Sequence, residues 1–239
     1  MNSPMTARTI AIMQPYFYPY LGYFALMHRA DEFVVLDCVQ FPRRGRVHRC
    51  QVPVSGGEDR WLTLPVARAP QGVSIRDLQF AEDAQTRWRA ALSRCAWART
   101  SVDDDVAGRV RAALGITGLS VADYLIRQLR LVRDTLGLTC RITRSSDMSL
   151  GPDVRGADRL IRIARARGAH TYLNAPNGRA LYDPAVFAAQ GLQLGFLPPY
   201  DGPFRHLLPA LLQRQAPAMI RDLNRYASLP LDGAEVAHA

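Results

Sequence analysis

Short apolar runs alternate with amphipathic segments along most of this chain. The first run, at 9–13, leads into a loop that holds Pro15 and Pro19, and a helical pattern at 20–29 and an apolar run at 32–37 follow. A strand, a helix and a second strand within about 30 residues predict a right-handed βαβ unit, whose strands are parallel. This alternation restricts the chain to folds built around a parallel sheet.

The C-terminal half repeats the alternation, with helical patterns at 120–136 and 157–167 and apolar runs at 138–143, 170–173 and 192–197. Between the two halves, residues 39–54 predict a β-hairpin that turns at 42–45, residues 60–66 a strand, and residues 82–115 helix. We therefore expect an α/β fold with a parallel-rich, Rossmann-like sheet and a β-hairpin and helical insertion at about 39–118. Residues 1–229 would form one domain, and 230–239 a disordered tail.

Lysine is absent from the 239 residues, so all 30 basic residues are Arg; with 21 acidic residues the net charge is +9. The absence excludes Schiff-base and pyridoxal-phosphate chemistry, and it excludes a P-loop with a Walker A lysine. Abundant Ala, Arg, Gly and Pro are typical of a GC-rich genome, so we attribute the charge to composition and expect no nucleic-acid partner. Anion recognition would depend on Arg, helix N-termini and backbone N–H groups.

No apolar run approaches the roughly 20 residues of a membrane helix, and the first eight residues do not resemble a signal peptide. We therefore expect a cytoplasmic protein with no membrane partner. The four cysteines have neither CxxC nor zinc-finger spacing, so we expect free thiols, no metal site and no cofactor.

Several motifs resemble the WbqC-like protein family. They are Met13-Gln14-Pro15, residues 19–24, Asp37, Val39-Gln40-Phe41, Arg44-Gly45, Arg49, residues 61–66, Ser145-Ser146, residues 157–161 and residues 171–173. The family occurs in surface-polysaccharide and natural-product gene clusters, so the resemblance implies a biosynthetic enzyme that transfers an acyl or aminoacyl group to an amine. This chain differs from the usual pattern at Cys38, where an acidic residue is common, and at His48, where Asn is common.

The predicted hairpin supplies the candidate catalytic groups. With Arg43 and Arg44 at its tip, the register places Asp37 opposite Cys50 and puts His48 on the same face. Cys50 would then be a nucleophile, His48 its base and Asp37 the group that orients His48. A shift of one residue would instead group Cys38 with His48. A packed core cysteine beside a hydrogen-bonded histidine is the structural alternative.

Candidate substrate-binding residues follow the predicted strands, because parallel sheets bind ligands at the carboxyl ends of their strands. The loop at 14–23 is either a ligand cradle that lines the main pocket or a structural aromatic corner. The hairpin arginines either bind an anionic donor or lie in solvent. The predicted set comprises Gln14, Tyr16, Tyr20, Tyr23, Gln40, Arg44, Arg49, Ser145, Ser146, Tyr172 and Asn177.

The sequence thus predicts a biosynthetic transferase that forms an amide. It would move an acyl or aminoacyl group from an activated donor, such as a thioester on a carrier protein, to a small-molecule amine. Two alternatives remain open at this stage. One is an ATP-dependent ligase or nucleotidyl-type enzyme that binds phosphates at the N-terminal loop, and the other is a non-catalytic sugar-nucleotide-binding protein.

Overall fold

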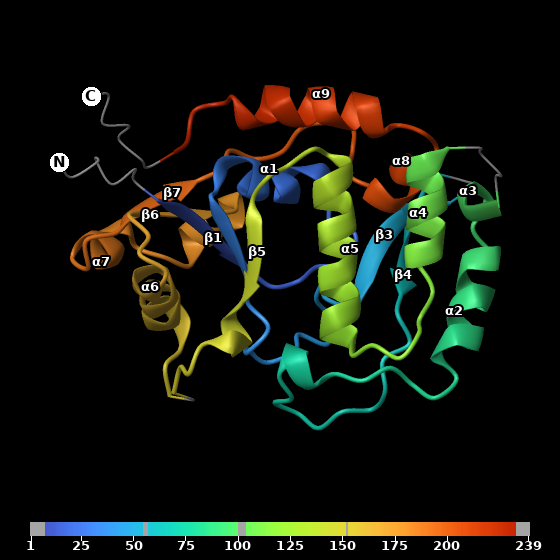
Figure 1. Cartoon of the computed structure of the whole chain (residues 1–239), viewed down its shortest axis with the longest axis horizontal. Helices are drawn as coiled ribbons and strands as arrows, with labels where there is room; N and C mark the ends of the chain where they lie inside the picture. Colours follow the sequence, from blue (N-terminus) through green and yellow to red (C-terminus); the bar gives the residue numbers. More distant parts are fainter. Residues whose placement is uncertain (1–7, 55–56, 100–103, 152, 233–239) are drawn as a thin grey trace.

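The computed structural model describes residues 8–54, 57–99, 104–151 and 153–232. Five parallel strands form the main sheet in the order β5-β2-β1-β6-β7 (Figure 1). The strands are β1 (Thr9–Met13), β2 (Glu32–Val35), β5 (Arg141–Arg144), β6 (Thr171–Asn174) and β7 (Gln193–Phe196). The predicted α/β fold with a parallel-rich, Rossmann-like sheet is confirmed.

The order of the strands reverses at the centre of this sheet. The chain runs outward from β1 through β2 to β5, and then crosses to the other side of β1 to form β6 and β7. The loops that follow β1 and β6 therefore lead away from each other, to opposite sides of the sheet. A reversal of this kind leaves a crevice at the carboxyl ends of the two strands, which is where such sheets bind ligands.

Helices cover both faces of the sheet. One face packs against α1 (Leu21–Arg29) and α5 (Val121–Thr135), and the other against α6 (Gly156–Ala166) and α7 (Pro184–Ala188). Successive side chains of a strand point to opposite faces, so Ile10 and Ile12 join the cluster under α6 and α7, whereas Ala11 joins the larger cluster with α1. Because both faces are buried at the centre of the sheet, β1 and β2 consist of nearly continuous apolar residues, whereas the edge strand β5 has one, Ile142.

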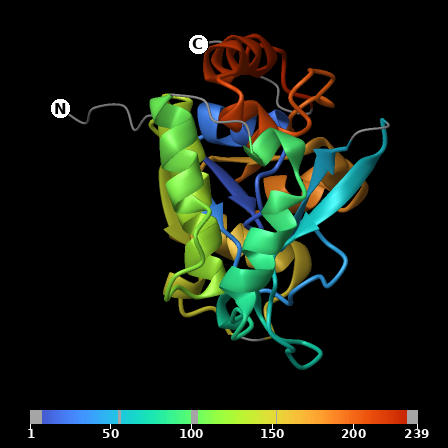
Figure 2. The same ribbon diagram turned by 90° about the vertical axis from the view of Figure 1, so that its right-hand side faces the viewer.

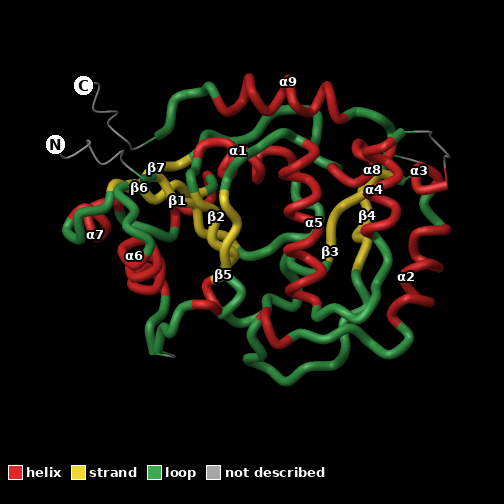
Figure 3. Tube along the Cα trace, in the orientation of Figure 1, coloured by secondary structure: helices red, strands yellow, loops and turns green. Residues whose placement is uncertain are grey.

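The segment between β2 and α5 forms the second half of the molecule. It contains an antiparallel pair of strands and several helices, seen from the side in Figure 2 and coloured by type in Figure 3. The elements are β3 (Arg49–Pro53), β4 (Asp59–Thr63), η1 (Ile75–Asp77), α2 (Ala84–Ser93), α3 (Ala96–Arg99) and α4 (Asp105–Ala113). One apolar cluster runs from this segment into the main sheet, so both halves share a core.

Two C-terminal helices connect the halves. α8 (Leu207–Leu212) packs against α3 and α4, while α9 (Ala216–Ala227) packs against α1 and crosses the top of the molecule in Figure 1. Of the tail predicted at 230–239, Asp232 exchanges two backbone hydrogen bonds of 3.0 Å with Phe196, and residues 233–239 lie outside the described residues. No helix within the described ranges is long and apolar enough to cross a membrane.

The predicted hairpin at 39–54 is wrong. Residues 42–45 do form a turn, in which the Gly45 N–H donates to the Pro42 carbonyl at 2.8 Å, but Gln40 bridges to Ser74 and Cys50 pairs with Leu62. The strand at 49–53 pairs with the next strand along the chain, and this pairing places Cys50, Val52 and Leu62 in the core. The segment around the turn carries Pro, Gly and three Arg instead and has no apolar face to bury.

Candidate active site at the carboxyl edge of the sheet

The crevice between β1 and β6 opens into a cavity of about 360 Å³. Gln14 follows β1 and lines one wall, while Asn174 and Asn177, at and after the end of β6, line the wall opposite. The other polar or aromatic lining residues are Tyr16, Tyr20, Tyr23, Arg46, Tyr172 and Tyr182. The loop at 14–23 therefore lies at the carboxyl end of its strand and lines a cavity, as its position in the sequence predicts.

Except for Arg46, which donates to the Gln51 side chain at 3.1 Å, the polar groups of this cavity are neutral. Among the described residues, the Gln14 side chain, the Asn174 Nδ2 and the hydroxyls of Tyr16 and Tyr20 have no hydrogen-bond partner. Burial raises the pKa of Tyr16 and of Tyr20, so both hydroxyls keep their protons and can donate. Uncommitted amides and hydroxyls between aromatic walls are suited to a neutral, polar small molecule.

The start of α1 is packed rather than open. The N–H of Leu21 donates to the Phe204 carbonyl at 3.0 Å, and the Tyr23 hydroxyl donates to the Gln14 carbonyl at 2.7 Å. The rings of Tyr20 and Tyr200 lie 5.7 Å apart between their centroids. The loop at 14–23 is thus an aromatic corner as well as a cavity wall, and the first N–H of the helix is already committed to a protein carbonyl.

A second cavity of about 580 Å³ adjoins the first, and both are lined by Gln14, Leu36, Leu160 and Tyr182. It lies between the carboxyl end of β2 and the N-terminal end of α6. Its remaining lining residues are Cys38, Val39, Gln40, Gly72, Arg155, Gly156 and Arg159. We call the two cavities together the edge cleft, with a neutral end at the crevice between β1 and β6 and a cationic end at Cys38 and Arg159.

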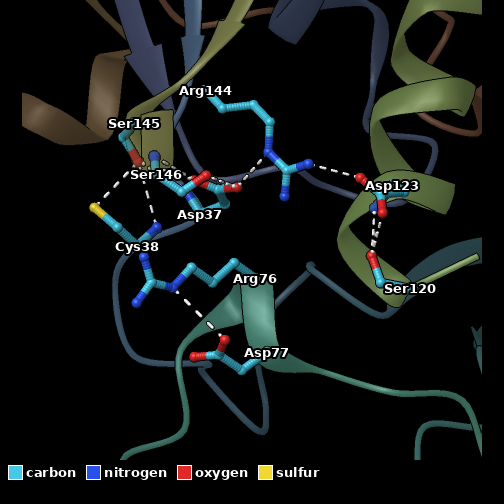
Figure 4. A network of polar contacts seen from close by, with 9 residues as sticks. All are labelled: Asp37, Cys38, Arg76, Asp77, Ser120, Asp123, Arg144, Ser145 and Ser146. Atoms are coloured by element: carbon cyan, nitrogen blue, oxygen red, sulfur yellow. Dashed lines mark hydrogen bonds and ion pairs between the residues drawn. The ribbon is translucent and has the colours of Figure 1, made fainter. Parts of the chain in front are cut away.

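Asp37 lies beneath this edge in a closed polar network (Figure 4). Its fully buried carboxylate accepts hydrogen bonds from Arg144 Nε at 2.8 Å, from Ser145 Oγ at 3.1 Å, and from Ser146 N and Oγ at 3.0 and 2.8 Å. Arg144 also pairs with Asp123 near the start of α5 at 2.6 Å. The network ties the ends of β2 and β5 together, and neither Ser145 nor Ser146 is among the described residues that line the edge cleft.

Residues 14–207 match the model of the WbqC-like protein family. The chain belongs to this family. It is also 27% identical over 199 residues to the uncharacterized protein Rv1507c of Mycobacterium tuberculosis (strain ATCC 25618 / H37Rv), which covers 82% of this chain and 84% of that protein. No solved structure is significantly similar to the chain. The family match includes Gln14, Cys38 and Tyr182, so all of the lining residues of the edge cleft except Ile12 and Met13 lie within the part that the WbqC-like model describes.

The predicted nucleophile of this WbqC-like protein is sealed in its core. Cys50 is 4% exposed, belongs to the main apolar cluster with Tyr18 and Cys95, and lies opposite Leu62 rather than Asp37. Burial raises the pKa of the Cys50 thiol far above its usual value. An inaccessible, neutral thiol is not a nucleophile.

The predicted base is equally unsuitable. Burial and the neighbouring charge of Arg49 lower the pKa of His48 to about 4, and its ring lies edge-on to Phe41 with 4.9 Å between centroids. Its Nδ1 has no partner among the described residues. Because the register differs and Asp37 is committed to two serines and Arg144, the mechanism that combines Cys50, His48 and Asp37 is wrong.

The arginines near the turn divide into structural and cleft-lining residues. Arg49 lies over the Trp61 ring at 4.2 Å and donates to the carbonyls of Arg44 and Gly45, while the Arg44 side chain is exposed and lines neither cavity. The expected anion site at Arg44 and Arg49 is therefore not assembled. Arg46 lines the neutral end of the edge cleft instead, because its carbonyl accepts a hydrogen bond of 3.0 Å from the N–H of Phe17.

The predicted residues Gln14, Tyr16, Tyr20, Tyr23, Gln40, Tyr172 and Asn177 do line the edge cleft. Four other residues line the edge cleft but were not in the predicted set, namely Arg46, Arg159, Asn174 and Tyr182. Of these, Arg46 belongs to the hairpin arginines, and Asn174 and Tyr182 belong to the loops expected to hold a substrate headgroup, so only Arg159 was missed entirely. Arg159 could have been selected from the sequence, because a charged residue on the apolar face of a predicted helix, here next to Leu160, indicates a functional or paired side chain. Within the described residues no group of His, Cys, Asp and Glu side chains could hold a metal ion.

Proposed function

We propose that this WbqC-like protein is a biosynthetic transferase that forms an amide. It moves an acyl or aminoacyl group from an activated donor to a small-molecule amine, in natural-product or surface-polysaccharide biosynthesis. The observation that carries the proposal is the edge cleft, whose two ends differ in chemistry and share one wall of four residues. A transfer needs donor and acceptor side by side, and two joined cavities support this better than one pocket does.

The neutral end is the acceptor site of this proposal. An amine attacks a carbonyl only as the free base, and a carboxylate next to it would hold it as an unreactive ammonium. The described residues that line this end include no Asp or Glu. The amides of Gln14 and Asn174 and the hydroxyls of Tyr16 and Tyr20 orient the acceptor through its other polar groups, and a cavity of about 360 Å³ suits a small molecule.

The cationic end is the donor site. The exposed Arg155 can bind the anionic groups of a thioester carrier, such as the phosphate of a phosphopantetheine arm on a carrier protein, and the positive charge of the more buried Arg159 lies at the same end. The four cysteines of the chain are free thiols, which fits a cytoplasmic location. The ATP-dependent alternative gains no comparable support, because the first N–H of α1 donates to a protein carbonyl rather than pointing into a phosphate site.

The test is amide formation without ATP. The protein is incubated with glycyl or acetyl thioesters of N-acetylcysteamine and with a panel of amines that includes aminosugars, and products are identified by mass spectrometry. Gln14→Ala should raise the KM for the amine about tenfold, because one or two hydrogen bonds to the acceptor are lost. Gln193→Ala is the matched control, because Gln193 is exposed at the amino end of β7.

Two results would overturn the proposal. ATP-dependent pyrophosphate exchange without thioester transfer would identify a ligase. Tight binding of a sugar nucleotide, with no product from any thioester and amine, would identify a binding protein.

A further inference from the structure

We infer that Cys38 is the nucleophile that accepts the acyl group before the group passes to the amine. The inference rests on the proposed transfer and deepens it by naming the residue that carries the covalent intermediate. Cys38 comes two residues after the Leu36 that follows β2, and its side chain lines the cationic end of the edge cleft. All four cysteines lie in the described ranges, and the other three are only 3–4% exposed, whereas Cys38 is partly exposed.

The first argument is the charge environment of Arg159. Arg159 is 9% exposed and forms no ion pair with a carboxylate of the described residues. Its Nε donates to the Val154 carbonyl at 2.7 Å, and its Nη1 donates to Cys38 Sγ at 2.9 Å. Buried cations in proteins are normally paired with an anion. The sulfur is the contacting group that can carry a negative charge, so Arg159 is placed to stabilise the charge on sulfur when Cys38 reacts as a nucleophile.

The second argument is the hydroxyl of Ser145, which lies 3.1 Å from Cys38 Sγ and 3.1 Å from Asp37 Oδ1 (Figure 4). The same oxygen accepts from the N–H groups of Asp37 and Cys38 at 3.1 and 3.3 Å, so its position is fixed. Its one proton can be donated either to the carboxylate or to the sulfur. Asp37 and Ser145 are thus positioning residues, which hold a donor beside the sulfur without touching substrate themselves.

The proposed chemistry proceeds in two balanced steps. The Cys38 thiolate attacks the carbonyl carbon of the donor thioester, a new carbon–sulfur bond forms, and the donor thiol leaves with the proton that Cys38 released. The amine then attacks the acyl-cysteine, a carbon–nitrogen bond forms as the carbon–sulfur bond breaks, and the proton of the amine returns to the sulfur. Neither step needs ATP or an oxidant, because the thioester supplies the activation.

One experiment measures the reactivity of Cys38 without any transfer. Limiting iodoacetamide at pH 7 and peptide mass mapping should show Cys38 alkylated before the other cysteines. Arg159→Gln should slow this alkylation about tenfold, because a charge-assisted contact to the sulfur is lost. Arg159→Lys, which keeps the charge, should retain part of the rate, and circular dichroism establishes that each variant folds.

Arg162→Gln is the matched control, since Arg162 lies on the same helix but is 57% exposed and pairs with Asp158. Equal alkylation rates in wild type and Arg159→Gln would overturn the role of Arg159. Alkylation of Cys50, Cys95 or Cys140 before Cys38 would overturn the choice of the thiol.

A second experiment follows the acyl group. After mixing with acetyl-N-acetylcysteamine thioester and no amine, intact mass and peptide mapping should find one acetyl group on Cys38, and none in Cys38→Ala. Cys140→Ala, at a buried position outside the cleft, should still be acetylated. Amide formation by Cys38→Ala at the wild-type kcat would refute the nucleophile while leaving the proposed transferase intact. An acetylated Cys38 in a protein that acylates none of the amines would support the nucleophile and count against the proposed transfer to an amine.

Discussion

Asp37→Asn should destabilise the protein strongly, because the Asp37 carboxylate is fully buried and accepts four hydrogen bonds. An amide of the same shape has one oxygen, so about half of the four donors lose their acceptor and face an NH₂ group instead. Hydrogen bonds to a charged group contribute about 1.5–3 kcal/mol each, so the loss of two predicts a free energy of unfolding lower by about 3–6 kcal/mol. For a chain of this size the melting temperature should fall by about 10 °C.

The assay is urea denaturation at pH 7, followed by circular dichroism, together with a thermal scan. Asp158→Asn is the matched control, because Asp158 is 56% exposed and its pair with Arg162 should contribute less than about 1 kcal/mol. If Asp37→Asn changed the free energy of unfolding as little as Asp158→Asn does, the network would not be a structural anchor. If Asp37→Asn lost activity but kept its full stability, Asp37 would have a role in the reaction rather than in the stability of the fold.

Two further predictions concern stability. Burial holds the pKa of His48 near 4 instead of its usual 6.5, so below pH 6.5 the unfolded chain binds a proton that the folded protein does not. The free energy of unfolding should therefore fall by about 2 kcal/mol as the pH drops from 6.5 towards 4. His48→Gln should flatten this pH profile in urea titrations, and an unchanged slope would contradict the argument from burial. Gly22→Ala should lower the melting temperature, since the new Cβ would lie 2.5 Å from the Tyr20 side chain and 2.7 Å from that of Tyr200. In the control Gly108→Ala the new Cβ meets no atom within 4 Å, so this variant should stabilise α4 by up to about 1 kcal/mol. A higher melting temperature for Gly22→Ala would show that the aromatic corner is not tightly packed.

Local sequence was sufficient to place the strands of the main sheet along the chain and to predict that they are parallel. Each strand of this sheet lies within three residues of its predicted start and end, because short apolar runs between loops are typical of buried parallel strands. The loop at 14–23 was also predictable, since Pro15 and Pro19 prevent helix until the chain has left the sheet. Its place at the carboxyl end of β1 follows from the direction of the chain alone.

Local sequence could not predict which distant segments pair as strands. The hairpin prediction failed because a turn signal at 42–45 fixes a local reversal but not which strand lies beside the one at 49–53. That choice depends on which pairing buries the apolar faces. Pairing with β4 places Cys50 beside Leu62 in the apolar core, whereas the predicted hairpin would have placed it beside the charged Asp37. The predicted catalytic set followed from the wrong register and failed with it.

The sequence by itself determined that the chain forms a parallel sheet, that polar and aromatic loops gather at one edge of it, and that lysine chemistry is excluded. Only the tertiary structure decided which side chains meet at that edge. Ser145 lies 108 positions from Asp37 and Arg159 lies 121 positions from Cys38, yet each pair is in contact. The physical reason is that periodicity encodes which face of an element is buried, whereas contacts across the sheet edge depend on strand order, and strand order is settled by packing the whole core.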